Sequence, residues 1–261
     1  MFTMFRRTLD FLYERYLERS VLQQKMPKHV GIILDGNRRY AQEAGLLGIQ
    51  DVYRLGAEKI HEVLEWSAEL DISVVTLWVL STDNLRRPPS EVSHIFAALE
   101  AKFLALAEAP DIHNRKVRVR ASGRLELLPA STSAAIRAAE AATKNYDAMS
   151  INIAVAYGGR EEITDAIRSL LAEKAKSGCS LTEIIDQVTP DEIAKHLYAP
   201  GVPDPDLIIR TSGEIRLSGF LLWQSAYSEF YFTDVYWPAF RKVDFLRAIR
   251  SYQQRKRRLG T

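Results

Sequence analysis

The chain has 261 residues, of which 47% are hydrophobic and 26% are charged, and its formal net charge is +2. These fractions are typical of a globular protein and exclude disordered and collagen-like chains. One cysteine, Cys179, excludes an intramolecular disulfide and a cysteine-rich zinc site. The longest apolar run, over residues 74–80, is far shorter than the ~20 residues that span a bilayer. The charged N-terminus lacks a secretory signal, so we expect a cytoplasmic protein.

The positive charge is concentrated at the C-terminus. Residues 250–261 hold five basic side chains and no acidic one. The rest of the chain carries 30 basic and 33 acidic residues, a net charge of −3. Non-specific binding of nucleic acid needs a basic surface, so we expect no nucleic-acid partner.

The first predicted element is an amphipathic helix over residues 4–24. Phe5, Leu9, Leu12 and Tyr16 recur at three- and four-residue steps, and charged residues cover the opposite side. The predicted helix ends before Pro27, because proline cannot continue a helix. The apolar stripe suits packing on the protein's own domain, which is favoured, or peripheral contact with a membrane surface.

Strand and helix patterns then alternate along the chain. A helix is predicted to begin near Asn37, and others cover 90–109 and 243–258. Such alternation favours a parallel sheet with helices on both faces. We therefore expect an N-terminal helix over 1–25 and one α/β domain over 26–261. The predicted strands cover residues 29–34, 72–80, 117–120, 150–156, 207–210 and, more weakly, 229–232.

A polar segment, Asp35-Gly36-Asn37-Arg38-Arg39-Tyr40, follows the first predicted strand. In open α/β sheets, ligands bind at the carboxyl ends of the strands, and a helix N-terminus there suits a phosphate group. The Asp35 carboxylate could hold Mg²⁺ shared with that phosphate. This hexapeptide alone equally allows a capped helix with a solvated charge pair. Asn37 stands where a Walker loop needs lysine, which excludes that class of nucleotide site.

Arginine and hydroxyl residues also follow the other predicted strands. They lie in Ser81–Pro88, Tyr157–Arg160, Arg210–Glu214 and Arg216–Gly219. The planar guanidinium group suits bidentate binding of phosphate. If the strands are neighbours, one pocket collects enough positive charge for two diphosphate groups, from Arg39, Arg87, Arg210 and Arg216.

In combination and in order, these segments resemble the signature motifs of the cis-prenyltransferase, or undecaprenyl diphosphate synthase, family. The resemblance extends from Pro27 to Gly260. Arg258-Leu259-Gly260 resembles the family's C-terminal R-x-G. The other matching segments are His29–Arg39, Ser81–Pro88, Asn152–Arg160, Asp206–Gln224 and Glu229–Phe232.

The resemblance implies a homodimer of α/β subunits that elongates an allylic diphosphate with isopentenyl diphosphate in cis geometry. It implies that Asp35 is the catalytic Mg²⁺ ligand, with Glu229 as a second metal contact, and that Asn84 is a candidate proton acceptor. Arg258 and Gly260 are expected to reach the partner subunit's site. The implied substrate-binding residues are Gly36, Asn37, Arg38, Arg39, Tyr40, Ser81, Thr82, Asp83, Leu85, Arg87, Arg210, Arg216, Leu217 and Ser218.

Three positions differ from the long-chain members of the family. Tyr53 stands where those members carry histidine, Leu85 replaces an aromatic residue, and Val79 replaces a small alanine beside the product tunnel. These features and the N-terminal helix resemble the short-chain Z-farnesyl diphosphate synthases. A larger side chain in the tunnel wall stops elongation early, because overpacking is unfavourable. The resemblance therefore favours geranyl diphosphate as acceptor and (2Z,6E)-farnesyl diphosphate as product, with Val79 limiting chain length.

Two alternatives stay open. The first is a synthase of much longer polyprenyl diphosphates, of the decaprenyl or undecaprenyl type. The second is a non-catalytic partner subunit, since some family members keep the R-x-G motif and lack activity. The complete loop from Asp35 to Arg39 argues against the second alternative, because inactive partners lose it.

Overall fold

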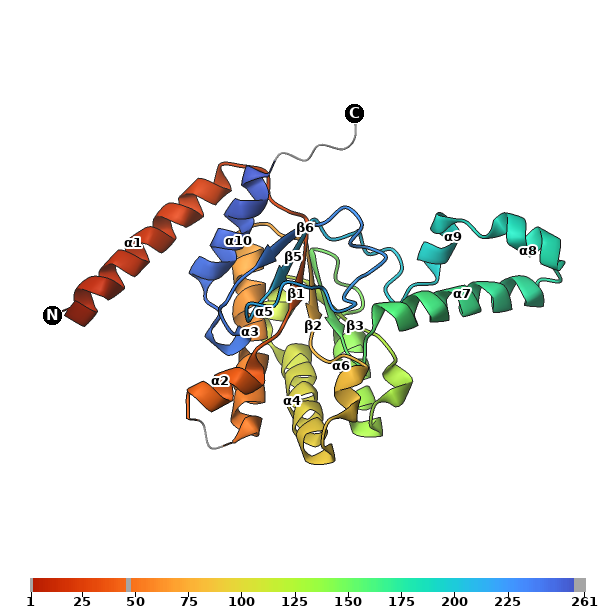
Figure 1. Cartoon of the computed structure of the whole chain (residues 1–261), viewed down its shortest axis with the longest axis horizontal. Coiled ribbons are helices and arrows are strands. Elements are labelled where there is room, and N and C mark those ends of the chain that lie inside the picture. The colour runs from red at the N-terminus through yellow and green to blue at the C-terminus, as the bar shows by residue number, and fades with distance from the viewer. Residues whose placement is uncertain (1, 46–47, 256–261) are drawn as a thin grey trace.

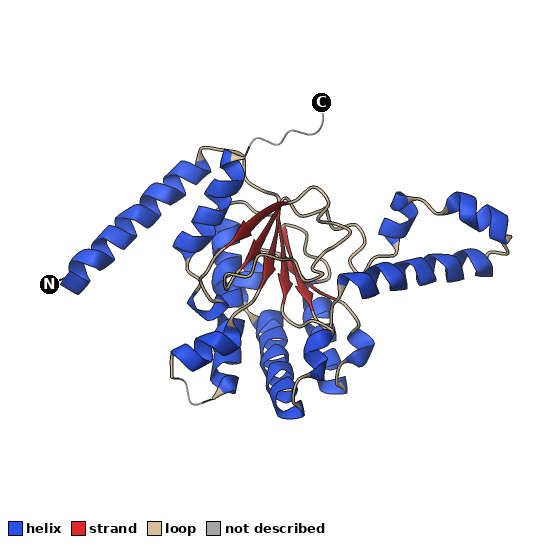
Figure 2. Cartoon of the chain, viewed as in Figure 1, coloured by secondary structure: helices blue, strands red, loops and turns tan. Residues whose placement is uncertain are grey.

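The computed structural model describes residues 2–45 and 48–255. Six parallel strands form one central sheet with helices around it (Figures 1 and 2). The expected single α/β domain is confirmed. In the described ranges, no helix is long and apolar enough to cross a membrane. The strands are β1 (His29–Ile33), β2 (Val74–Trp78), β3 (Val117–Ser122), β4 (Met149–Ala154), β5 (Leu207–Arg210) and β6 (Glu229–Phe232).

The strand order is β3-β4-β2-β1-β5-β6, so the chain changes direction across the sheet at β1. In the parallel ladder, Ile33 lies beside Trp78 on one side and beside Arg210 on the other. All five residues of β1 and of β2 are buried, as expected for strands covered on both faces. The segments that follow β1, β2 and β5 therefore emerge at one edge of the sheet, at its topological switch point.

The helices agree with the predicted pattern except after Asn37. Where one helix was predicted to begin, the chain forms two, α2 and α3, and Gly45 after α2 has a φ of +63° that favours glycine. The helices are α1 (Phe2–Leu22), α2 (Asn37–Glu43), α3 (Ile49–Glu69), α4 (Pro89–Glu108), α5 (Pro110–Asn114), α6 (Ala130–Thr143), α7 (Gly159–Lys176), α8 (Leu181–Gln187), α9 (Pro190–Lys195) and α10 (Lys242–Gln254), with 3₁₀ turns η1 (Asp83–Arg86), η2 (Leu125–Leu127) and η3 (Trp237–Ala239).

One hydrophobic cluster covers each face of the sheet, and a smaller third cluster lies between α7 and the end of α9. The largest cluster joins alternate strand residues to apolar residues of α3, α4, α6 and α10. The second cluster lies on the other face, where the rings of Trp78 and Phe220 stack with their centroids 5.4 Å apart. Gly31 in β1 allows this packing, because a Cβ there would lie 3.0 Å from the Phe220 ring. The central strands are thereby fixed from both sides.

Helix α1 packs on α10 through its C-terminal half. Leu17 and Val21 are fully buried, and the Lys242 ammonium donates to the Glu18 carboxylate at 2.7 Å. Farther toward the N-terminus, Phe11 and Tyr16 are 62% and 60% exposed. In Figure 1 the N-terminal half of α1 points away from the sheet. The favoured packing on the protein's own domain thus holds for the C-terminal half.

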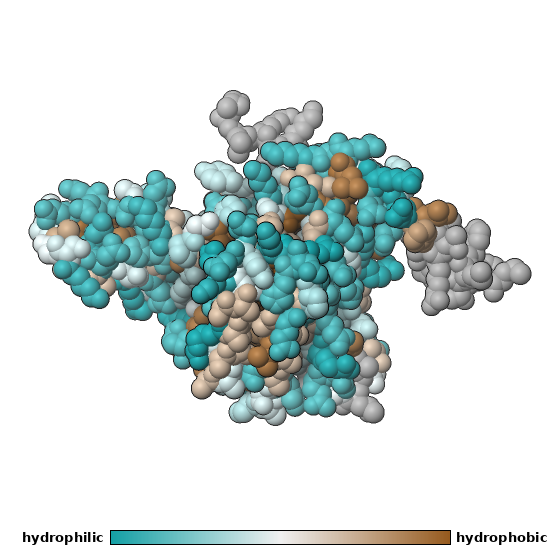
Figure 3. Space-filling view, turned by 180° about the vertical axis from the view of Figure 1, so that it is seen from behind, coloured by the Kyte–Doolittle hydropathy of each residue, from teal (hydrophilic) through white to brown (hydrophobic). Residues whose placement is uncertain are grey.

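Helices α7, α8 and α9 form an arm that extends from the opposite side of the domain (Figure 1). Seen from behind, the arm is mostly hydrophilic with scattered apolar residues (Figure 3). A Ser180 capping box begins α8, where Leu181 and Ile185 are 72% and 64% exposed. The arm lies away from the carboxyl edge of β1, where the cavity described below is found.

Candidate active site

The site begins at Asp35, directly after β1. Its backbone N–H donates to the Thr211 hydroxyl at 2.9 Å, and its carbonyl oxygen accepts from the Trp237 N–H at 3.0 Å. Gly36 then turns the chain into α2 with a φ of +98°. A Cβ at Gly36 would lie 2.6 Å from the Tyr236 ring and 2.8 Å from Ser212. Glycine is therefore the residue that this turn accepts, and the turn fixes the direction of Asp35.

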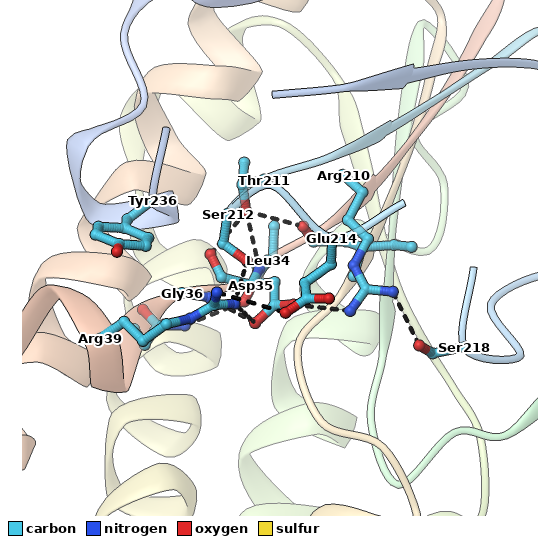
Figure 4. Close-up of polar contacts among 12 residues, drawn as sticks. Leu34, Asp35, Gly36, Arg39, Arg210, Thr211, Ser212, Glu214, Ser218 and Tyr236 are labelled. Carbon is cyan, nitrogen blue, oxygen red and sulfur yellow. Dashed lines mark hydrogen bonds and ion pairs between the residues drawn. The ribbon is translucent and has the colours of Figure 1, made fainter. Parts of the chain in front are cut away.

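The Asp35 carboxylate faces two arginines from different elements (Figure 4). Arg210, at the end of β5, donates to Oδ2 at 2.8 Å, and Arg39 of α2 lies 3.7 Å from Oδ1. Burial by itself would raise the pKa of Asp35, but the hydrogen bond and charge of Arg210 outweigh it and lower that pKa below its usual value. Asp35 is therefore an ionised carboxylate at neutral pH.

Arg210 connects Asp35 to the loop after β5. Its guanidinium is nearly buried, and its Nη1 donates to the Ser218 hydroxyl at 2.8 Å and to the Arg216 carbonyl oxygen. Arg39 is tied to the same region, because it donates to the Ser212 hydroxyl at 2.6 Å and lies 3.4 Å from Glu214. The loop and the carboxylate are therefore held as one polar network.

A second polar cluster joins α3 to α4. The Tyr53 hydroxyl donates to the Glu91 carboxylate at 2.7 Å and accepts from Arg87 at 3.2 Å. Arg87 also donates to Glu91 at 3.1 Å, and Arg38 lies 3.9 Å from the same carboxylate. Burial and the Glu91 contact raise the pKa of Tyr53, so its hydroxyl stays protonated. The neutral Tyr53 hydroxyl and the Glu91 carboxylate together hold the Arg87 guanidinium in place.

One cavity of about 480 Å³ lies between these clusters and continues between α3 and α4. Its entrance is polar and its inner wall is mainly apolar, so its shape suits a ligand with an anionic head and an apolar tail. The polar lining comprises Asp35, Asn37, Arg38, Arg39, Tyr53, Asn84, Arg87, Lys102, Glu214 and Arg216. The remaining lining comprises Leu34, Gly36, Gly56, Ala57, Ile60, Val79, Ile95, Ala98, Leu99 and Trp237.

The structure brings together most of the residues that the sequence singled out. Three of the four expected arginines line the cavity, and Arg210 contacts Asp35 directly. Asn84 also lines it, with its carboxamide oxygen accepting from the Ser81 N–H at 3.2 Å. Ser218 joins the site through Arg210. The other expected substrate-binding residues do not line the cavity: Tyr40, Ser81, Thr82, Asp83, Leu85 and Leu217.

Glu229 is placed differently from the expectation. It begins β6, where it pairs with Leu207 in the ladder, and Arg255 donates to its carboxylate at 2.6 Å. Phe232, three residues and roughly 10 Å farther along β6, marks the edge nearer to Asp35. Within one chain, Glu229 therefore lies toward the edge of the sheet opposite to Asp35. In the described ranges, no three acidic, histidine or cysteine side chains cluster for a metal ion.

Arg258 and Gly260 lie outside the described residues.

The apolar wall of the cavity was not predicted from the sequence, and neither were Lys102 and Glu91. Ile60, Ile95 and Leu99 have the helical spacing of ordinary core residues, which carries no sign of a cavity. Trp237, whose indole N–H donates to the Gly56 carbonyl at 2.8 Å, comes from a 3₁₀ turn with no motif. Lys102 gave the one usable signal, a cation within an apolar stripe.

Comparison with known proteins identifies the family. Residues 33–260 match the family model described as "Putative undecaprenyl diphosphate synthase". An isoprenyl transferase of Deinococcus radiodurans is 54% identical over 249 residues, which cover 95% of this chain and 90% of that protein. The chain therefore belongs to the cis-prenyltransferase family, and it is a prenyl-transferring enzyme.

Two further relatives with the same identity carry different names. A (2Z,6E)-farnesyl diphosphate synthase of Thermobifida fusca is 54% identical over 95% of this chain and 96% of that protein. A geranylgeranyl-diphosphate-specific tritrans,polycis-undecaprenyl-diphosphate synthase of Methanopyrus kandleri is 54% identical over 95% of this chain and 90% of that protein. Overall identity therefore leaves product length open.

A solved structure also supports the fold. Lavandulyl diphosphate synthase from Lavandula x intermedia, solved with dimethylallyl diphosphate, has a TM-score of 0.82 and 33% identity. The match covers 90% of this chain and 99% of that structure. Its fold is that of the six-stranded domain described above.

Proposed function

We propose that this enzyme condenses isopentenyl diphosphate with geranyl diphosphate and releases (2Z,6E)-farnesyl diphosphate. The observation that carries the proposal is the single cavity that joins the Asp35 end, rich in arginine, to an apolar space bordered by Val79. The diphosphate group of an allylic substrate fits the first part, and its isoprenoid chain fits the second. The relative from Thermobifida fusca supports the product length.

We assign the allylic diphosphate to Arg38, Arg39 and Arg87 together with the backbone at Gly36 and Asn37. The guanidinium groups suit the charge and the planar oxygen geometry of phosphate. Arg210, Arg216 and Ser218 are assigned to isopentenyl diphosphate, because Arg210 holds the loop that carries the other two. Both reactants then meet in one pocket, which lowers the entropic cost of their encounter.

Asp35 fits a Mg²⁺ ion that is shared with the substrate. It is ionised and partly exposed, with 30% of its side chain accessible, and among residues 2–45 and 48–255 it belongs to no cluster of three potential metal ligands. Mg²⁺ is commonly held by one or two carboxylates plus substrate phosphates. When bound there, the ion would neutralise negative charge that develops on the leaving diphosphate.

In the proposed reaction, the allylic C1–O bond breaks and its electron pair leaves with diphosphate. The isopentenyl double bond supplies the electrons of the new C–C bond to C1, and a proton then leaves isopentenyl C2. Arginines stabilise the departing anion, while the apolar wall excludes water from the developing carbocation. Asn84, held by Ser81 at the cavity wall, is our candidate for receiving the proton, and a diphosphate oxygen is the alternative.

We also infer a homodimer, in which Arg258 and Gly260 reach the partner subunit's diphosphate site. The family resemblance of the C-terminal R-x-G supports this inference. The inference also explains why the C-terminus is basic, although the rest of the chain carries a net charge of −3.

The direct test is a product assay with purified protein, Mg²⁺ and labelled isopentenyl diphosphate. Dimethylallyl, geranyl and farnesyl diphosphates are supplied separately, and the dephosphorylated products are separated by length and by double-bond geometry. We expect one fifteen-carbon Z,E product, formed mainly from geranyl diphosphate. A ladder of much longer products would replace the short-chain proposal with the long-chain one. Absence of turnover with all three acceptors would favour the non-catalytic alternative.

Val79 gives a prediction about product length. It lines the cavity, and replacing it with alanine removes two methyl groups from the wall. We expect Val79→Ala to lengthen the main product by at least one isoprene unit, because the space gained relieves overpacking of about 1–3 kcal/mol. Chromatography of the dephosphorylated products measures this change. Unchanged product length in a folded Val79→Ala protein would show that Val79 does not limit the chain.

A further inference from the structure

The inner wall of the cavity contains one cation that the proposed reaction does not use. Helix α4 lines the cavity with Ile95, Ala98, Leu99 and Lys102, which are spaced three, four and seven residues from the first. This spacing places the four side chains on one face of a helix. Lys102 is therefore a charged residue at the end of an otherwise apolar row.

The row runs away from the diphosphate end. Glu91, also on α4, contacts Tyr53 and Arg87 at the polar entrance. Lys102 is eleven residues farther along, roughly 16 Å at the helical rise of 1.5 Å per residue. Of the α4 residues that line the cavity, Lys102 is the most distant from that entrance.

This distance matches the reach of a short isoprenoid chain. Three bonds of an extended chain span about 3.6 Å, so the backbone of a farnesyl group spans roughly 13 Å and that of a twenty-carbon group roughly 18 Å. A fifteen-carbon chain that starts beside the polar entrance can therefore end before the turn of α4 that carries Lys102. One more isoprene unit would reach that turn.

The surroundings of Lys102 do not neutralise it by a close pair. The acidic groups that act on it are Asp111 and Glu58. The Asp111 carboxylate lies 3.6 Å from the His61 ring nitrogen, and the Glu58 carboxylate lies 3.2 Å from the Arg54 guanidinium. Burial lowers the pKa of Lys102, and the two acids partly oppose that shift. An alkyl chain pressed against this ammonium would remove more of its water, which is costly for a charged group.

We propose that Lys102 is a specificity-determining residue that ends chain elongation by the cost of desolvating its ammonium group. The inference rests on the proposed short-chain function and adds a second limit to it, distinct in kind from the bulk of Val79. Bulk blocks a chain by shape, whereas the ammonium disfavours an apolar neighbour because it would lose hydrating water. The two limits are separable because methionine keeps nearly the length of lysine without its charge.

The first test compares Lys102→Met with Lys102→Arg. We expect Lys102→Met to raise the ratio of products with twenty or more carbons to fifteen-carbon product at least about tenfold, which corresponds to about 1.4 kcal/mol. Lys102→Arg, which keeps the charge, should retain the wild-type distribution. Lys144→Met, which removes an exposed lysine just after α6, is the matched control for loss of one charge and should also match wild type. Equal product lengths for Lys102→Met and wild type would overturn the proposal.

The second test measures binding and needs no turnover. Trp237, one of four tryptophans, lines the cavity, so a change in tryptophan fluorescence can follow binding of farnesyl and geranylgeranyl diphosphates without isopentenyl diphosphate. We expect wild type to bind the twenty-carbon ligand about tenfold more weakly than the fifteen-carbon one, and Lys102→Met to bind both within about threefold. Equal relative affinities in the two proteins would overturn the proposal even if the enzyme proved active. If no acceptor were elongated, the proposed function would fail separately, while this affinity difference would still support a length limit at Lys102.

Discussion

Replacing Asp35 with asparagine is expected to lower kcat/KM about 10³-fold, which corresponds to roughly 4 kcal/mol of transition-state stabilisation. Asparagine keeps the shape, but its single carboxamide oxygen can accept only one of the two hydrogen bonds that Asp35 accepts, from Arg210 at 2.8 Å on Oδ2 and from the Gly36 N–H at 2.7 Å on Oδ1. The loss should therefore come from the missing negative charge together with one lost hydrogen bond. Steady-state kinetics with geranyl and isopentenyl diphosphates measures it.

A binding measurement separates the metal role of Asp35 from a structural one. In wild type, Mg²⁺ should tighten the binding of geranyl diphosphate, as followed by tryptophan fluorescence, whereas in Asp35→Asn it should have little effect. Asp186→Asn, which neutralises an exposed carboxylate on α8, is the matched control and should leave both measurements unchanged. Activity of Asp35→Asn within about threefold of wild type would rule out Asp35 as the catalytic carboxylate.

Most strands could be predicted from the sequence because they are short runs of buried apolar residues between turn signals, whereas β6 is only half-buried. The predicted limits of β5 and β6 agree with the structure, and those of the other strands differ by a few residues. The break between α2 and α3 was not predicted, although Gly45 and Gly48 stand close to it. Their neighbours continue a helical pattern, so only the positive φ of Gly45 reveals the turn.

The polar part of the site was predictable for a topological reason. Parallel strands end at one edge, so Asp35 after β1 and Arg210 at the end of β5 had to be close once β1 and β5 were neighbours. The same reasoning accounts for the position of Glu229, which stands at the beginning of its strand and therefore at the other edge of the sheet within the chain. Its proposed role as a metal contact came from the family resemblance, which carries no information about this edge.

The apolar part of the site was not predictable, because a cavity wall and a packed core have the same periodicity. Ile95 and Leu99 of α4 are buried like any core residue, and only the helix that faces them decides whether space is left between. On α3 the small side chain of Ala57 leaves part of that space open, whereas Gly56 allows Asn37 and Trp237 to approach the helix closely. Within this stripe a lysine is the informative exception, since lysine is rarely placed among apolar neighbours without a function or a partner.

Removing the positive charge of Arg210 is expected to change both the stability of the protein and its pH dependence. Arg210 is 5% exposed and donates to Asp35, Ser218 and the Arg216 carbonyl. Arg210→Met leaves the Asp35 carboxylate without its main partner. Because that carboxylate is partly exposed, we expect a cost of about 1–3 kcal/mol, less than for a fully buried pair. Thermal unfolding should show it as a fall in Tm of roughly 2–10 °C.

The pH dependence follows from the two opposing effects on Asp35. In wild type its pKa is lowered, so its pairing stabilises the fold above the unfolded-state pKa and is lost as the pH falls through the lower folded-state pKa. Arg210→Met removes the hydrogen bond and the charge that lower the pKa of Asp35 most, so this pKa rises, although the hydrogen bonds with the Gly36 N–H and Ser212 still act to lower it. The acid limb of the kcat/KM profile should therefore move to higher pH, while Arg210→Lys, which keeps a charge, should move it less. Coincident acid limbs in Arg210→Met and wild type would show that Asp35 is held ionised by something other than Arg210, and the polar network proposed to hold both diphosphates would need a different centre.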